Sequence, residues 1–575
     1  MTARALRRPA VLAAPGRRSD LLWGTGVAVT AIVVGKYAAS PELARAAVAF
    51  AFVALVAGVG FRNPRPLLLG LPIWLVLLGL LRRLLSGVSA AGAADPLLLV
   101  APVALIVLTF AAADHGAFRN HTRLSKLVLL YSIATCAGAF NPLQPSITAG
   151  VTALIFFVPL LAFWIGRGLV DSELLRRLLL IVGAAAVPAA LYGLRQTFVG
   201  FPSWDDAWIE SRGYVALNVD GVIRPFATFS SAAEYATFIA VAMLVWLRLG
   251  PRRLLRPAAV AVAAMLAVAV FYQSSRGSVV MLVAGGAVML AAWRRLPVIA
   301  AAAFGAVLLL MVPAVVKHFA PTSYSSEASS TLVQNQVVGL SNPFDPNTST
   351  AGAHLGLMRG GIESAFRNPL GQGISSVTIA GEKFGGVTNA TEADPSNAAV
   401  ALGLPGLLLF IGLFASGFGA AYRLARGGDP LAGVAVGILT VTALQWLNGG
   451  QYAVAFVPWL ILGWVDARLL EHDHAAKPEE LPVARPQPRV LRPCPPVRAA
   501  PPVKRRSPPK VQPSMSRAPQ QWNVFALERV RPQNDFERHL IISLRSYASL
   551  SGTLPPEFDP LVREVFADRL EELGR

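Results

Sequence analysis

Apolar runs of roughly 20 residues recur through the first 470 positions, and no other feature constrains the fold as strongly. A helix needs about 20 apolar residues to cross a hydrocarbon core of ~30 Å, so each run is long enough for one crossing. Charged residues make up only 14% of the chain, whereas an average soluble protein has roughly 25%. The sequence therefore predicts an all-α polytopic membrane protein whose transmembrane domain covers residues 21–470.

The apolar runs divide into fourteen expected spans. They lie near residues 21–38, 43–60, 67–82, 96–113, 126–140, 149–166, 178–196, 226–247, 257–273, 277–293, 296–316, 396–420, 430–447 and 452–468. The third and fourth spans could instead form a re-entrant pair, because Arg82 and Arg83 end the third. That alternative leaves twelve true crossings, so we expect 12–14 transmembrane helices.

Basic residues are distributed unevenly between the segments that join the spans. With residues 1–20 in the cytoplasm, the short inner segments hold 21 basic residues, about twice as many as the longer outer segments. This bias predicts a multi-pass protein of the cytoplasmic membrane with both termini in the cytoplasm. The net charge of +19 has the same origin, so we expect no nucleic-acid partner. Arg82 and Arg83 are the exception, because this scheme places them outside.

Two outer loops are long, at residues 197–225 and 317–397. In a membrane protein, long loops are where function concentrates. Within the second loop, Gly352–Phe366 places its apolar residues at helical spacing. This spacing predicts an amphipathic helix that lies on the membrane or on the helix bundle.

The composition changes after residue 470. Leu481–Gln520 has twelve prolines and nine basic residues with no acidic one, so residues 471–520 are expected to form a disordered cytoplasmic linker, either resting on anionic membrane lipid or simply solvated. Residues 521–575 carry two helical apolar stripes, which predict a small helical module for a cytoplasmic protein partner. Cys136 and Cys494 are isolated, so they predict neither a disulfide nor a metal site.

Three arginines fall at outer ends of spans. Arg276 lies 20 residues after the inner Arg256 and 18 before the inner Arg294, so both flanking runs are crossings. Arg195 ends the seventh span and Arg224 precedes the eighth. Guanidinium groups bind phosphate in a bidentate manner, so these residues predict a site for a lipid-linked phosphate or pyrophosphate, with help from the loop residues Arg212, Arg359 and Arg367. Alternatively, the side chains extend to lipid headgroups.

Four short sequence motifs, which we call phrases, follow one another along the chain. They are Arg224-Pro-Phe-Ala-Thr-Phe-Ser230, Ser274-Ser-Arg-Gly277, Asn368-Pro-Leu-Gly-Gln-Gly373 and Gly403-Leu-Pro-Gly-Leu-Leu-Leu-Phe410. Together with the long outer loop they resemble the O-antigen ligase/O-antigen polymerase superfamily, over residues 120–470. The resemblance implies an inverting glycosyltransferase that needs no metal or cofactor. Such enzymes take a glycan from undecaprenyl diphosphate on the outer face and pass it to a glycan or lipid-linked acceptor. Their pyrophosphate-binding arginines correspond to Arg195, Arg224 and Arg276.

Many members of that family also carry a His-Asn pair shortly before the Gly-Leu-Pro-Gly turn, and this chain has no histidine there. The acceptor hydroxyl still needs a general base, and a partly buried carboxylate can serve. The candidates are Asp394, Glu392 and His354, each of which could instead be an ordinary solvated loop residue. Glu234, inside the eighth span, could pair with an arginine rather than act in catalysis.

Other functional classes remain open from the sequence. A transporter or flippase of lipid-linked sugars also needs outer arginines, but transporters show internal repeats and interrupted spans, and the sequence reveals no such pattern. A non-catalytic scaffold of an envelope-polysaccharide assembly complex would act through its cytoplasmic tail. The sequence favours the enzyme and does not separate a polymerase from a ligase.

Overall fold

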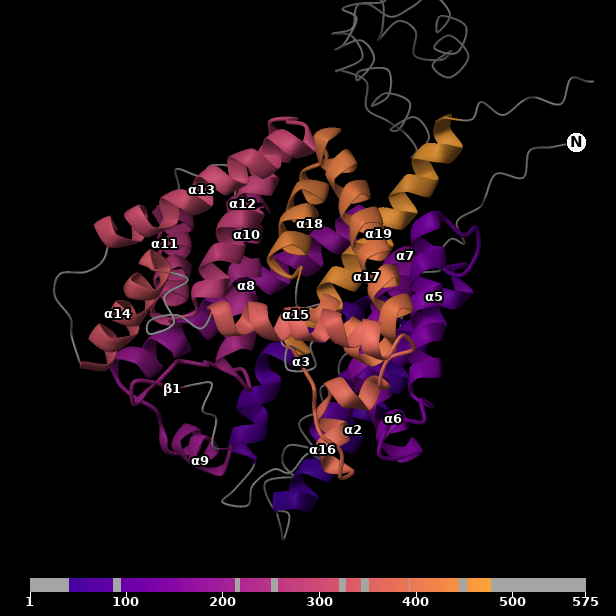
Figure 1. The fold of residues 1–575 in the computed structure, drawn as a ribbon, viewed down its shortest axis with the longest axis horizontal. Coiled ribbons are helices and arrows are strands. Elements are labelled where there is room, and N and C mark those ends of the chain that lie inside the picture. The colour runs from indigo at the N-terminus through magenta and orange to yellow at the C-terminus, as the bar shows by residue number, and fades with distance from the viewer. Residues whose placement is uncertain are drawn as a thin grey trace, which may run out of the picture. The chain divides into compact units, whose positions relative to one another are not determined.

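A computed structural model describes residues 41–85, 95–212, 218–249, 257–319, 327–342, 351–391, 393–443 and 452–476. Within these residues the chain is almost entirely helical (Figure 1). Nine helical segments in this part of the chain are long and apolar enough to cross a membrane. The chain is therefore an all-α, multi-pass membrane protein, as the sequence predicts.

The described helices follow the order of the expected spans. They are α2 (Pro41–Arg62), α3 (Pro64–Leu84), η1 (Pro96–Leu99), α4 (Val100–Asp114), α5 (Arg123–Gly138), α6 (Ile147–Ala153), η2 (Leu154–Leu161), α7 (Ala162–Leu169), α8 (Ser172–Phe198), α9 (Ser203–Arg212), α10 (Ala232–Leu249), α11 (Pro257–Tyr272), α12 (Arg276–Trp293), α13 (Val298–Phe319), α14 (Glu327–Ser341), α15 (Ala351–Arg367), η4 (Ile374–Val377), α16 (Ile379–Lys383), α17 (Asp394–Arg426), α18 (Pro430–Val441) and α19 (Tyr452–Ala476). A hairpin of β1 (Asn218–Val219) and β2 (Val222–Ile223) precedes α10.

The limits of some spans differ from the expected ones. The eighth span begins at Ala232 rather than near residue 226, because the segment after β2 is not helical. α3 has 21 residues and η1 with α4 has 19, lengths that fit two full crossings rather than a re-entrant pair. α19 continues to Ala476, past the expected boundary at 470. The expected span 21–38, the rest of the linker and the module at 521–575 lie outside the described residues.

Side-chain contacts join the segments between spans in two groups. Among the expected inner segments, Arg65 pairs with Asp171, and Arg167 donates to the backbone oxygens of Ala117 and Asn120. Among the expected outer segments, Asn141 donates to the backbone oxygen of Gly371. These contacts join segments that the sequence assigns to the same side of the membrane, and they mark two distinct ends of the bundle.

Glycines allow close approach inside the bundle. A Cβ at Gly166 of α7 would lie 2.1 Å from the backbone oxygen of Leu460, and one at Gly463 of α19 would lie 1.9 Å from that of Phe163. Small residues let membrane helices approach in this way, because packing rather than the hydrophobic effect drives their association. Next to this crossing, Arg167 and Asp466 form a buried ion pair of 2.9 Å, which satisfies both charges inside the bundle.

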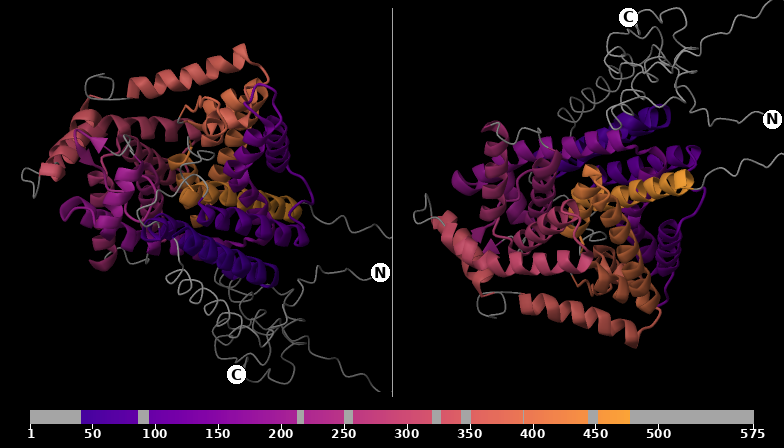
Figure 2. Two further views of the ribbon diagram at one scale, coloured as in Figure 1. Left: turned by 90° about the horizontal axis from the view of Figure 1, so that it is seen from below. Right: turned by 90° about the horizontal axis from the view of Figure 1, so that it is seen from above.

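The second outer loop contains helices of its own. α15 confirms the predicted amphipathic helix; it runs across the upright helices in Figure 1 and along one side of the bundle in both views of Figure 2. Ile362 and Ala365 pack against Ala399 of α17, so one face of α15 lies on the bundle. Leu355 and Phe366, also among the apolar residues at helical spacing, are 49% and 67% exposed, so these two do not pack on protein within the described residues.

Candidate anion-binding site

The turn between α11 and α12 carries Arg276 and is held by α14 of the long loop. Ser274 has a left-handed backbone, with φ of +58°. Its hydroxyl donates to the backbone oxygen of Leu332 at 2.9 Å and accepts from the amide nitrogen of Asn335 at 2.9 Å. The Arg276 guanidinium in turn donates to Asn335, with Nε 3.2 Å from its backbone oxygen and Nη2 2.5 Å from Oδ1. The turn and α14 therefore form one hydrogen-bonded unit.

The guanidinium of Arg276 also lies directly on the backbone of Gly339. A Cβ at this glycine would be 1.8 Å from Nε and 1.9 Å from Cζ of Arg276. Any other residue at position 339 would have to move the guanidinium. Asn335 and Gly339 are one helical turn apart, so both contact Arg276 from the same side of α14.

Arg224 is close enough to Arg276 for the two charges to interact. Its Nε is buried and has no hydrogen-bond partner within the described part of the chain. Burial lowers the pKa of Arg224 from its usual value, and the positive charge of Arg276 lowers it further. β2, which ends just before Arg224, contacts α14, and Figure 1 shows β1 and α14 on the same side of the bundle. The exposed Asp220 is close enough to interact with Arg276. Two guanidinium groups are thus close enough for their charges to interact, which is an arrangement suited to a multiply charged anion.

The segment that follows, residues 224–231, we call the strap. Its backbone is fixed by polar side chains from two other helices. Oε1 of Gln196 accepts from the backbone nitrogens of Phe226 and Ala227 at 3.0 and 2.7 Å. Arg83 donates to the backbone oxygens of Ala227 and Phe229 at 2.5 and 2.7 Å. These bonds hold Ala227 at φ of +50°, a left-handed conformation that is uncommon for a residue with a Cβ.

Arg82 and Arg83 are both buried, and each forms an ion pair with an aspartate. Arg83 Nε lies 3.0 Å from Asp205 of α9, and the two side chains are fully buried. Arg82 Nε donates to Asp95 at 2.7 Å, and its guanidinium stacks over Trp208 at 5.0 Å from the ring centroid. These contacts place both arginines with the segments expected outside, where carboxylates neutralise them. Sequence reasoning missed this network, although it noted that the two arginines violate the charge rule.

The other arginines predicted for the anion site make contacts elsewhere, and none of these contacts involves Arg224 or Arg276. Arg195 is exposed at the end of α8, and its Nη1 donates to the backbone oxygen of Gly200 at 3.0 Å. Arg359 forms an exposed ion pair of 2.6 Å with Glu363 on α15. Arg367 is exposed at the end of the same helix, and Arg212 ends α9. The structure thus brings together Arg224 and Arg276 of the predicted set.

The candidate bases occupy different environments. Asp394 is fully buried as the first residue of α17, close enough to the buried Tyr131 of α5 to interact with it. It is therefore not a solvated loop residue. His354 is exposed on α15, and Glu392 lies outside the described residues. Glu234 is buried at the start of α10, where its carboxylate accepts from the backbone nitrogen of Ser230 at 3.3 Å and interacts electrostatically with Arg83.

The two glycine-rich phrases of the second half of the chain touch each other. A Cβ at Gly403 would be 2.0 Å from the backbone oxygen of Pro369, and one at Gly371 would be 2.3 Å from that of Ala401. The backbone nitrogen of Gly373 donates to Ala401 at 2.9 Å. Gly403 adopts φ of +67° and breaks α17 into two helices. These phrases therefore have a structural role, in which only glycine allows the two backbones to approach.

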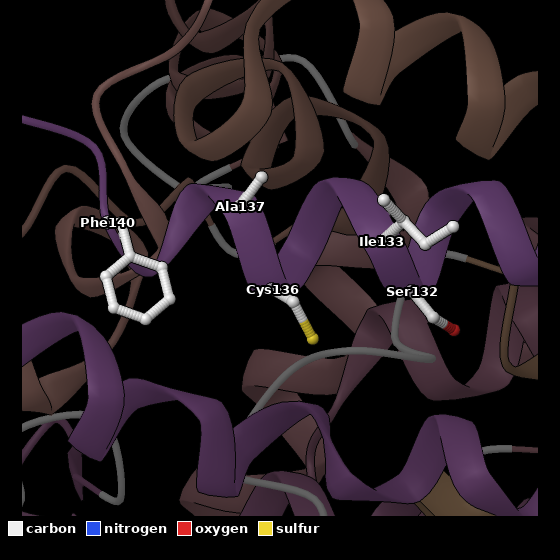
Figure 3. Close-up of a pocket in the computed structure, with 5 residues that line it drawn as sticks. All are labelled: Ser132, Ile133, Cys136, Ala137 and Phe140. Atoms are coloured by element: carbon white, nitrogen blue, oxygen red, sulfur yellow. The ribbon is translucent and has the colours of Figure 1, made fainter.

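An apolar groove of about 400 Å³ runs along α5, lined by Ser132, Ile133, Cys136, Ala137 and Phe140 (Figure 3). No charged residue lines it, so the groove suits alkyl chains of lipid rather than a sugar or a phosphate. Cys136 is exposed there, as expected for a residue on the lipid-facing side of a span.

Comparison with models of known protein families finds no match to this chain, and neither does a search of curated proteins. The resemblance to the O-antigen ligase/O-antigen polymerase superfamily therefore rests on the four phrases and the long outer loop. Two of these phrases carry Arg224 and Arg276, and the other two form the contact at Gly403.

Proposed function

We propose that this protein is a membrane glycosyltransferase that takes a glycan from undecaprenyl diphosphate at the outer face of the cytoplasmic membrane. It transfers or polymerises that glycan for the cell envelope or an exopolysaccharide, without a metal ion or cofactor. The observation that carries the proposal is that Arg224, whose Nε is buried without a hydrogen-bond partner within the described residues, is close enough to Arg276 for the two charges to interact. A diphosphate carries the complementary charge, and its lipid tail keeps it at the membrane boundary.

In the proposed reaction, the acceptor hydroxyl attacks the sugar carbon that is bonded to the diphosphate. Negative charge then builds up on the departing diphosphate, and fixed guanidinium groups stabilise it more than they stabilise the bound donor. Because the surroundings of Arg224 are partly desolvated, its interaction with this charge is stronger than it would be in water. Of the two candidate bases that the structure describes, Asp394 is buried at the start of α17, whereas His354 is exposed on α15.

Replacement of Arg276 by lysine tests the proposal directly. Arg276→Lys keeps the charge but loses the planar guanidinium group that binds phosphate in a bidentate manner, so we expect transfer activity to fall about 100-fold. The measurement is transfer from a lipid-linked donor by the purified protein. Arg359→Lys is the matched control, because Arg359 is exposed and paired with Glu363, and it should keep its activity. Full activity of Arg276→Lys would remove this arginine from the diphosphate site.

A transporter or flippase of lipid-linked sugars is the second candidate, and one observation favours it. Two spans are interrupted, one by η2 between α6 and α7 and the other by the break at Gly403 in α17. Transporters bind their substrates at discontinuous helices, and sequence analysis did not find these interruptions. Reconstituted protein separates the two classes. An enzyme forms a new glycosidic bond, whereas a flippase moves the lipid-linked sugar across the bilayer unchanged.

A further inference from the structure

We infer that Asn335 and Gly339 of α14 are positioning residues that orient Arg276 toward the diphosphate. This inference rests on the proposed function. Neither residue belongs to the phrases that suggested that function. Both lie in the long loop, 59 residues or more after Arg276 in the sequence.

The contact with Asn335 determines which part of the guanidinium remains available. A guanidinium presents two bidentate edges, one formed by Nε and Nη2 and the other by Nη1 and Nη2. Asn335 occupies the first edge, through its backbone oxygen and its Oδ1. Nη1 and the second N–H of Nη2, which point along the other edge, make no hydrogen bond within the described residues, so they can bind two oxygens of a phosphate. Asn335 thus fixes the plane of the group and leaves the second edge for the ligand.

Gly339 fixes the position of the same group by its lack of a side chain. The guanidinium lies where a Cβ would be, so the arginine can approach α14 closely enough to reach Asn335. α14 is itself secured to the turn by the bond from Ser274 to Leu332. Three contacts therefore hold Arg276 and α14 in one arrangement. A group that is held in advance loses less conformational entropy when the ligand binds.

The test measures binding of undecaprenyl diphosphate to the full-length protein in nanodiscs of phosphatidylcholine. Gly339→Ala pushes the guanidinium away from Asn335, and we expect binding to weaken about tenfold or more, as for other residues that orient a ligand-binding group. Gly356→Ala is the matched control. Gly356 is a helical glycine of the same loop with open space around it, so this variant should bind as the wild type does.

A double-mutant cycle separates positioning from general stability. If Gly339 acts through Arg276, then Gly339→Ala has no further effect on binding once Arg276→Ala is present. An equal loss of binding in both backgrounds overturns the inference, because that result describes a merely structural residue. Asn335→Ala introduces no clash, so it gives the same test if Gly339→Ala does not fold, and wild-type binding by Asn335→Ala also overturns the inference. If Arg276→Ala alone binds with full affinity, the proposed diphosphate site fails instead.

Discussion

Gly403 shows how a single residue can decide the path of a membrane span. Its φ of +67° turns the chain, and its missing side chain lets Pro369 approach. The next residue extends this contact, because Leu404 donates its backbone N–H to the backbone oxygen of Pro369 at 3.0 Å. A residue with a Cβ would meet both a conformational penalty and a steric one.

Gly403→Ala should therefore destabilise the protein by about 2 kcal/mol or more. Part of the loss comes from the left-handed backbone, which costs an alanine about 1–2 kcal/mol, and the rest comes from the collision with Pro369. The measurement is the thermal midpoint of the purified protein in detergent. Gly419→Ala, later in α17 and with nothing nearby, is the control and should not lower the midpoint. Equal midpoints for the two variants would contradict the structural role of Gly403.

At the scale of elements, the network around Arg83 joins α3, α9 and the strap. Arg83 pairs with Asp205 and donates twice to the strap, while Gln196 of α8 binds both Asp205 and the strap. Gly79 of α3 contributes as well, because a Cβ there would be 2.4 Å from the backbone carbon of Phe229. This network fixes the strap that begins with Arg224, so the outer end of α3 supports the proposed anion site.

Removal of one partner from this network should lower the free energy of unfolding substantially. Arg83→Ala leaves Asp205 buried without its counter-charge, and breaking such a pair costs about 3–5 kcal/mol. Arg65→Ala removes an ion pair with Asp171. The two side chains are 65% and 53% exposed, so the free energy of unfolding should fall by only about 0–1 kcal/mol. Unfolding of the two variants in the same detergent gives the comparison. A similar loss of stability in both would mean that Arg83 is not held as described.

Nine of the described helical segments match expected spans, because each of them carries its own signal, an apolar run of sufficient length. The sequence also singles out Arg224 and Arg276, since arginines at span ends are conspicuous. It could not reveal that Asn335 binds Arg276, because the two residues are far apart in the chain and no local pattern links them. For the same reason Arg82 and Arg83 looked like a violation of the charge rule. Their neutralisation by Asp95 and Asp205 depends on tertiary packing.

At the scale of the whole molecule, the two ends of the bundle differ in their charges. Arg65, Arg167 and Arg248 belong to segments at one end, where Arg248 also stacks on Trp293. At the other end Arg82 and Arg83 are neutralised by buried carboxylates, and Arg224 and Arg276 form the proposed anion site. An excess of Lys and Arg in short loops favours the cytoplasmic side. This asymmetry predicts that α14, α15 and the anion site face outward.

Labelling of single cysteines tests that orientation. In a Cys136→Ala, Cys494→Ser background, Gly356→Cys lies on exposed α15 and Asp114→Cys lies at the exposed end of α4, on the opposite side of the predicted membrane. A membrane-impermeant maleimide added to spheroplasts should react with Gly356→Cys at once. It should react with Asp114→Cys only after the membrane is permeabilised. The reverse pattern would place the anion site in the cytoplasm, where a carrier that presents its glycan outside could not reach it.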